Sequence, residues 1–413
     1  MKSVLELKKI AEDRLKDFHI RSFKGMDKPL ILISTAYAGV WMEHIYDAVF
    51  LASLDKKYLP IAINTIEMFL DKQSDEGQFP CYVRDRAVVP DYSEERVVCY
   101  SHIQECVSVG SLFLKVCEMT GDKALLTRCY NAIENWTNWL KKYRMTRGLG
   151  LTEMFCGVDT GHDNSGRLAD IEYRLTYDDK TDPNNWKKIP ASKRVDFKDG
   201  VSPIITVDMN CNLYGNFMAL SKMAKMLGLL DRAKDWENEA KTIKKRLFEL
   251  CFDKEDCFFY DLDINGNKRK FLSSTIFHLF QEKVLDKIED KDLIEKIYTK
   301  YIKNPKHFWT EYPFPSMSAS DPSSKDHIDG NTWGYFTQGL TVLRATLWMD
   351  EYGYSEDFNY ILSKWLKGWT DNYETLKFGQ ELDPHTGKPS TASEWYSTCL
   401  LLYIYGTNRL GLI

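Results

Sequence analysis

The chain has 413 residues, of which 44% are hydrophobic and 28% are charged, and its formal net charge is -5. These values are typical of a globular protein and argue against a disordered chain and against a nucleic-acid partner. No stretch approaches the roughly 20 apolar residues that a membrane-spanning helix needs. The charged amphipathic segment at 1–17 lacks the apolar core of a signal peptide, which predicts a cytoplasmic location without a membrane partner.

The sequence carries none of the usual signatures of a metal or phosphate cofactor. Its ten cysteines are scattered without a CxxC pair, and His44 and His162 are single imidazoles without metal-ligand spacing. A glycine-rich phosphate loop and a GxSxG elbow are also missing from the sequence. We therefore expect reduced thiols, no metal and no cofactor.

Apolar residues recur at alternating intervals of four and three along most of the chain, as on one face of a helix. One such stripe runs from Leu213 to Leu227, and a second runs from Ala233 to Leu247 after the turn GLLD, which predicts an antiparallel helical hairpin. The same pattern predicts helices at 59–70, 109–119 and 125–140. Further helices are expected near 40–54, 288–303, 332–351, 355–370 and 391–406.

Sequential helical hairpins must bury their apolar stripes against neighbours, and a closed ring of hairpins does so without exposed end repeats. We therefore predict an all-α fold, an (α/α)6 toroid of six helical hairpins in which long loops form a cleft. No linker divides the chain, so 1–413 is expected to be a single catalytic domain, with only short extended runs such as 257–263. The segment 144–204 has no helical period, and a loop of that length predicts an active-site insertion.

The stretch GHDNSGR at 161–167 lies inside this insertion and contains a candidate catalytic acid. A carboxylic acid that keeps its proton in an apolar cleft can act as a general acid. Aromatic residues make up 13% of the chain and could line such a cleft, because sugar rings stack on aromatic faces. The alternative is an ordinary turn, in which Asp163 or Asn164 caps its own backbone.

Hydrolysis of a glycosidic bond with inversion needs a second carboxylate, about 6.5–9.5 Å from the acid, to deprotonate the attacking water. The candidates are Glu381, which precedes the turn-forming run DPHTG, and Glu394, which precedes Trp395. For each of these glutamates the alternative is a solvated loop charge.

The stretch GHDNSGR also resembles the Gly-x-Asp-Asn/Asp-x-x-Arg segment of glycoside hydrolase family 63 and its relatives, the trehalases. Other segments are similar to that family in the same order, namely VWMEHIYDAVFLA (40–52), DEGQFPCYV (75–83), SHIQECVSVGSLFLKVCEMTGD (101–122), VDMNCNLYGNFMALSKMAKMLG (207–228), FPSMSASDP with DGNTWGYF (314–336), and ELDPHTG with SEWYSTCLLLY. The resemblance covers roughly 35–405 and is nearest to short bacterial enzymes like mannosylglycerate hydrolase. It independently implies the (α/α)6 fold.

The resemblance implies an inverting exo-glycosidase that acts on a small α-linked glycoside, such as a glucoside, a mannoside or a glycosylglycerate. Asp163 would be the general acid and Glu381 the general base, with Glu394 as the alternative base. The residues expected to bind the sugar are Trp41, Tyr46, Asp47, Gln104, Arg167, Trp333 and Trp395. Arg167 has a second expected role, that of anchoring the loop.

The sequence departs from the family pattern at the base loop. Gln380 stands where the family has its glutamate, Glu381 comes one place later, and Leu382 replaces a tyrosine. Val158 and the segment 329–331 also depart, which affects substrate choice more than reaction class.

The alternatives are a sugar epimerase or polysaccharide lyase on the same toroid, which the lack of paired histidines disfavours, and a non-catalytic carbohydrate-binding protein. The expected partner is a small carbohydrate, and a homo-oligomer is compatible with the sequence.

Overall fold

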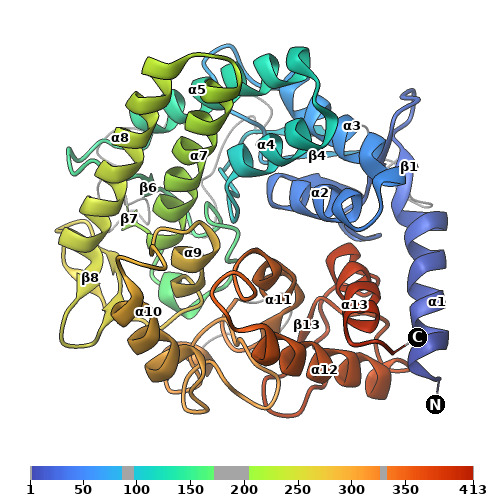
Figure 1. Ribbon diagram of the computed structural model, residues 1–413. Helices are drawn as coiled ribbons and strands as arrows, with labels where there is room; N and C mark the ends of the chain where they lie inside the picture. The colour runs from blue at the N-terminus through green and yellow to red at the C-terminus, as the bar shows by residue number, and fades with distance from the viewer. Residues whose placement is uncertain (1, 86–96, 172–203, 326–332, 413) are drawn as a thin grey trace.

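The computed structural model describes residues 2–85, 97–171, 204–325 and 333–412. Helices in these ranges form two concentric rings around one axis (Figure 1). The inner ring contains α2 (Ile45–Leu54), α4 (Val109–Thr120), α7 (Val207–Met226), α9 (Ile276–Gln281), α11 (Gly339–Arg344) and α13 (Ser397–Arg409). The outer ring contains α1 (Val4–Arg14), α3 (Leu59–Asp71), α5 (Lys123–Tyr143), α8 (Leu230–Arg246), α10 (Lys291–Ile297) and α12 (Ser355–Asn372).

Inner and outer helices alternate along the chain, as the hairpin pattern predicts. Inner helices contact one another around the ring, from α11 to α13, α2, α4, α7 and α9, and α13 also packs against α1 and α12. The (α/α)6 toroid is confirmed. In the part of the chain that the structure describes, no helix is long and apolar enough to cross a membrane.

Most of the helices predicted from periodicity are present, with two corrections. Residues 332–351 do not form one long helix, because Thr337–Gln338 form the short strand β12 and α11 spans only Gly339–Arg344. The helix α9 was not predicted. All six of its side chains are buried, so it has no polar face and gives no amphipathic period.

Short strands lie between the helices and are antiparallel where they pair. The larger sheets have the strand orders β3-β4-β5 and β11-β10-β7-β6, and three further sheets are two-stranded. The strands are β1 (Ile20–Ser22), β2 (Pro29–Ile31), β3 (Gly39–Trp41), β4 (Tyr82–Arg84), β5 (Val97–Cys99), β6 (Glu153–Met154), β7 (Ile204–Ile205), β8 (Phe252–Asp253), β9 (Phe258–Phe259), β10 (Asp261–Leu262), β11 (Lys268–Arg269), β12 (Thr337–Gln338) and β13 (Glu381–Leu382). The strands β9 and β10 confirm the predicted extended run at 257–263.

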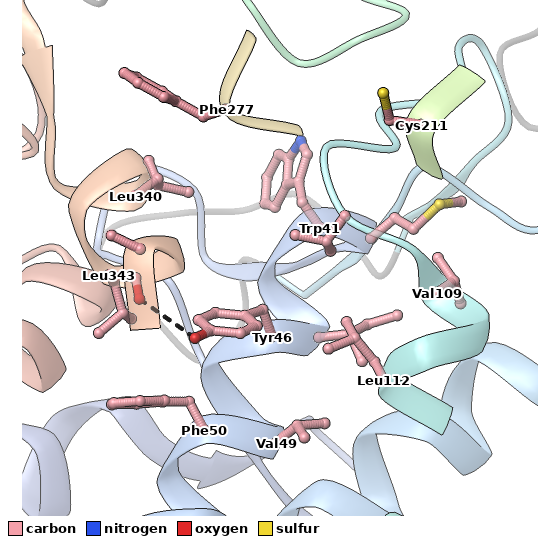
Figure 2. Packing of buried hydrophobic residues seen from close by; sticks show 14 of the residues in the cluster. Trp41, Tyr46, Val49, Phe50, Val109, Leu112, Cys211, Phe277, Leu340 and Leu343 are labelled. Atoms are coloured by element: carbon pink, nitrogen blue, oxygen red, sulfur yellow. Dashed lines mark hydrogen bonds between the residues drawn. The ribbon is translucent and has the colours of Figure 1, made fainter. Parts of the chain in front are cut away.

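The apolar core includes residues of both the inner and the outer helices. In Figure 2, Tyr46, Val49 and Phe50 of α2 lie beside Leu112 of α4, and the Tyr46 hydroxyl donates to the carbonyl of Leu343. Burial of such apolar side chains is the main force that holds the ring together. The predicted insertion 144–204 is described only up to residue 171 and from residue 204, and its remainder lies outside the described residues.

Candidate active site

A cavity of about 290 Å³ lies at the end of the ring where several inner helices begin. Several contributing segments come just before a helix or strand, with Trp41, Glu43 and His44 before α2, Gln104 before α4, Gln380 before β13 and Tyr396 just before α13. The remaining lining residues are Ile33, Ala36, Tyr37, Tyr82, Arg84, His102, Val158, Gly161, Asp163 and Trp333. Loops at one end of a helical ring therefore build a polar cavity with aromatic walls.

Aromatic rings form the walls of this cavity. Trp41 stacks on Tyr82, with ring centroids 4.5 Å apart, and meets Tyr37 edge to face. On the Asp163 side, Trp333 stacks on the imidazole of His162 at 4.3 Å. Such fixed ring faces suit the C–H faces of a sugar.

Asp163 lies on the cavity wall in the loop between β6 and the 3-10 helix Gly166–Leu168. Its backbone carbonyl accepts a hydrogen bond of 2.8 Å from the Trp333 amide, which ties the two wall segments together. Gly161 has a φ of +73°, and a side chain there would come within 2.3 Å of Cys106 Sγ. The loop therefore needs glycine at this position for both its conformation and its close packing.

Arg167 anchors the Asp163 loop and is itself only 1% exposed. Its Nη2 donates to Asp208 Oδ2 at 2.7 Å and to His162 Nδ1 at 3.0 Å, and its Nη1 donates to Asp261. Burial lowers the pKa of His162 well below its usual value, so the ring is neutral and Nδ1 is an acceptor. Burial alone would raise the pKa of Asp208, but the charge of Arg167 lowers it to about 2.

The side chains of His162, Asp208 and His278 have ligand-type atoms within 4.8 Å of one another. The guanidinium of Arg167 donates to His162 and to Asp208, so a fixed positive charge already compensates the Asp208 carboxylate. We interpret this group as a buried ion-pair network that supports Trp333 through the His162 ring.

Glu43 is a second carboxylate on the cavity wall, and the sequence reasoning did not single it out. Its Oε2 accepts a 2.9 Å hydrogen bond from Arg344, and its Oε1 lies 3.6 Å from His44 Nδ1. Burial lowers the pKa of His44, whose Nε2 pairs with the Tyr396 hydroxyl at 2.8 Å. The sequence does contain a signal for Glu43, because this residue comes two positions after Trp41 in the segment that carries the family resemblance.

The structure brings four of the predicted site residues to the cavity: Trp41, Gln104, Asp163 and Trp333. Gln104 has a φ of +56°, and its amide oxygen pairs with His102 Nε2 at 2.8 Å. The other predicted residues are not among those that line the cavity.

Among these, Tyr46 and Asp47 lie within the first turn of α2. The Tyr46 hydroxyl pairs with Thr346, while Asp47 accepts from Ser397 and Thr398, and burial raises the pKa of Asp47. The side chain of Trp395 is half-buried, and the guanidinium of Arg14 lies over its ring. These residues and Arg167 all make contacts within the protein, and their expected sugar contacts stay a prediction.

Both expected base residues also lie away from the cavity wall. Glu381 is fully buried, and it accepts hydrogen bonds from Gln338 and, at 2.6 Å, from Ser390. Its neighbour Gln380 lines the cavity instead, because successive side chains of an extended segment point to opposite faces. Glu394 is partly exposed to solvent, with a side-chain exposure of 42%, and its carboxylate lies 3.9 Å from the Lys377 ammonium.

The family model of the mannosylglycerate hydrolase MGH1-like glycoside hydrolase domain matches residues 40–397. The chain belongs to this family. The resemblance to glycoside hydrolase family 63 is thereby confirmed, and the protein is a glycoside hydrolase. The match includes the lining residues from Trp41 to Tyr396, whereas Ile33, Ala36 and Tyr37 precede it.

Solved structures with the same fold include the family 63 mannosylglycerate hydrolase of Thermus thermophilus in complex with glucose. It has a TM-score of 0.72 and 16% identity, over 97% of this chain and 100% of that chain. The same enzyme with Tris and D-glycerate has a TM-score of 0.69 and 15% identity, over 97% and 99%. The neutral trehalase Nth1 of Saccharomyces cerevisiae has a TM-score of 0.66 and 15% identity, over 99% and 80%.

A sequence relative is an uncharacterized protein of Borreliella burgdorferi. It is 32% identical over 137 residues, which are 33% of this chain and 27% of that protein. The alignment thus spans about a quarter of the relative's length.

Proposed function

We propose that this glycoside hydrolase cleaves a small α-linked glycoside with inversion at the anomeric carbon. The observation that carries the proposal is the presence of two carboxyl groups, Asp163 and Glu43, on the wall of one small cavity with aromatic faces. A volume of about 290 Å³ is near the lower limit for ligand sites, which favours a short, exo-cleaved substrate over a polysaccharide.

Asp163 is the proposed general acid, which protonates the leaving oxygen. Its loop is held from two sides, by Trp333 at the backbone and by Arg167 four residues later, so the carboxyl group can be presented in a fixed position. General acid catalysis contributes about 10²–10⁴-fold to the rate.

Glu43 is the proposed general base in place of Glu381 or Glu394. A base must reach the attacking water, and Glu43 is the second carboxylate among the described lining residues. Arg344 fixes its carboxylate by a hydrogen bond of 2.9 Å. Gln380, at the position where the family has its glutamate, cannot take up a proton and is assigned to hydrogen bonding with the substrate.

The proposed substrate class includes glucosides, mannosides and glycosylglycerates. The Thermus thermophilus mannosylglycerate hydrolase binds glucose in one structure and D-glycerate in another, so glycosylglycerates are the first compounds to test. A single catalytic domain over 1–413, a small carbohydrate as partner and a cytoplasmic location belong to the same proposal. The cytoplasmic location is supported by ten cysteines that are all free thiols.

The test is NMR analysis of the anomer first released from a panel of α-glucosides, α-mannosides and glycosylglycerates. We expect the β-anomer and a loss of about 10²–10⁴-fold in kcat/KM for Asp163→Asn. That variant should keep more of its activity on nitrophenyl glycosides, because this leaving group needs little protonation. Full activity of Asp163→Asn on natural glycosides, or binding without turnover on every substrate, would contradict the proposal.

The base assignment is tested by three variants made in parallel. Glu43→Gln should lose turnover on natural and nitrophenyl glycosides alike, because water activation is needed for both. Glu381→Gln should keep the rate per folded molecule, with unfolding followed separately. A strong gain in Gln380→Glu together with an active Glu43→Gln would assign the base to position 380 instead.

A further inference from the structure

A second cavity, of about 570 Å³, lies between the inner helices on the side away from the carbohydrate cavity. The first cavity takes its residues from the segments before α2 and α4, whereas the second is lined by positions further along the same helices, such as Phe50 and Leu112. Glu43 lies in the 3-10 helix Met42–His44, just before α2, whereas Phe50 lies about 8 Å along α2 from its first residue, since an α-helix rises 1.5 Å per residue. The exposed side chains of Lys115, Glu118 and Lys222 mark its mouth.

The inner wall of this cavity is mostly apolar. Phe50 of α2, Leu112 of α4, Met218 of α7 and Leu347 form this apolar surface. The hydroxyl groups of Tyr46, Ser53 and Ser108 that border the cavity already donate to protein atoms. Such a wall offers few polar partners to a carbohydrate and suits an apolar ligand body.

One carboxylate lies in this apolar setting. Glu282 is only 8% exposed, and its Oε1 accepts hydrogen bonds from the Ser108 amide at 3.3 Å and from Gln281 Nε2 at 3.2 Å. Its Oε2 accepts no hydrogen bond from any residue in the described ranges. Gly215 provides the space for that atom, because a Cβ there would lie 2.2 Å from Oε2.

The neighbouring cation does not neutralise Glu282. The ammonium of Lys283 pairs with Glu351, and the described residues place no cation within ion-pair distance of the Glu282 carboxylate. Burial raises the pKa of Glu282 to about 7. A carboxylate in an apolar setting without a paired cation is costly, and a ligand that brings a charged donor would relieve that cost.

We propose that the second cavity is a binding site for a small amphipathic organic amine, distinct from the carbohydrate cavity. The ammonium of the ligand donates to Glu282 Oε2, and its apolar body packs against Phe50, Leu112 and Met218. The lysines at the mouth are exposed and hydrated, so their repulsion of the bound cation is screened. This inference goes beyond the proposed glycosidase function and does not depend on it.

The experiment is calorimetric titration with three probes of matched shape: 2-phenylethylamine, the neutral 2-phenylethanol and the anionic 3-phenylpropionate. We expect saturable 1:1 binding of the amine and at least tenfold weaker binding of the other two. Affinity for the amine should rise from pH 6 to pH 8, because Glu282 loses its proton over that range while the amine stays protonated. Glu282→Gln should weaken amine binding at least tenfold and remove its pH dependence.

Amines could also bind near Asp163 and Glu43, so Asp163→Asn and Glu43→Gln are the matched controls and should keep full amine affinity. Thermal unfolding shows whether Glu282→Gln is folded. The wild-type comparison of amine with alcohol tests the proposal even if that variant is not. Equal binding of amine and alcohol, binding abolished by Asp163→Asn but unchanged in Glu282→Gln, or no binding at millimolar amine would overturn it.

Discussion

The buried pairs of Arg167 offer the sharpest test of how the Asp163 loop is held. Replacement of Arg167 by methionine keeps an apolar stem but removes a guanidinium that donates to Asp208 and Asp261. All three side chains are at least nine-tenths buried. The variant therefore leaves two carboxylates inside the protein without their cation.

The expected cost follows from this burial. Removal of one partner of a buried ion pair destabilises a protein by about 3–5 kcal/mol, because an uncompensated charge remains. That is a large share of a typical free energy of unfolding of about 5–15 kcal/mol. Arg128 is the matched control, because it too contacts two carboxylates, Asp71 at 2.8 Å and Glu67 at 3.7 Å, but at the surface. Arg128→Met should cost about 0–1 kcal/mol.

The assay is urea unfolding of the wild type and both variants at pH 7.5 and pH 5. For Arg167→Met we expect a smaller loss of stability at pH 5, because protonation of a stranded carboxylate relieves part of the cost. Arg167→Met/Asp208→Asn should recover part of the loss at pH 7.5. Equal effects of Arg167→Met and Arg128→Met on the free energy of unfolding would refute the reasoning.

Two further predictions concern packing and pH. Gly161→Ala should lower stability and turnover together, because its Cβ would lie 2.3 Å from Cys106 Sγ. Gly148 has a similar φ of +70° but open space around it, so Gly148→Ala should show only the smaller backbone strain. Equal unfolding midpoints for the two variants would argue against the steric cause. Burial raises the pKa of Glu105 from its usual value of 4.5 to about 7, so between these values the folded state holds a proton that the unfolded state has lost. The free energy of unfolding should therefore fall as the pH rises from about 5 to 7. In unfolding titrations, the free energy of unfolding of Glu105→Gln should fall less than that of the wild type over this pH interval. An unchanged pH slope in the variant would count against Glu105 as the responsible group.

The fold could be predicted where a helix has one apolar and one polar face. The stripe at 233–247 corresponds to α8, which is long and only partly buried, and the stripe at 213–227 lies in α7, which is mostly buried but exposes Lys222 and Lys225. The helix α9 escaped prediction because its six residues are all buried. The expected helix at 332–351 was shortened by pairing of β12 with β13, a contact between segments more than forty residues apart in sequence that no local period reveals.

The site could be predicted where a loop motif fixes the position of a residue. Asp163 lies between two glycines and next to Trp333, and the structure places it on the cavity wall. The base could not be located in the same way, because a shift of one residue in an extended segment reverses the face to which a side chain points. Gln380 and Glu381 are adjacent, yet one lines the cavity and the other is buried behind it.

The described part of the Asp163 loop is fixed by ion pairs on both sides of Asp163. On the N-terminal side of Asp163, Asp159 pairs with Arg144 at 3.4 Å. On its C-terminal side, Arg167 pairs with Asp208 and Asp261. Buried ion pairs add little net stability compared with apolar packing of the same volume. They do impose a specific geometry, because each guanidinium must meet its carboxylate at a defined position and angle. We therefore attribute these pairs to the placement of Asp163, which requires an orientation that non-directional apolar packing does not specify.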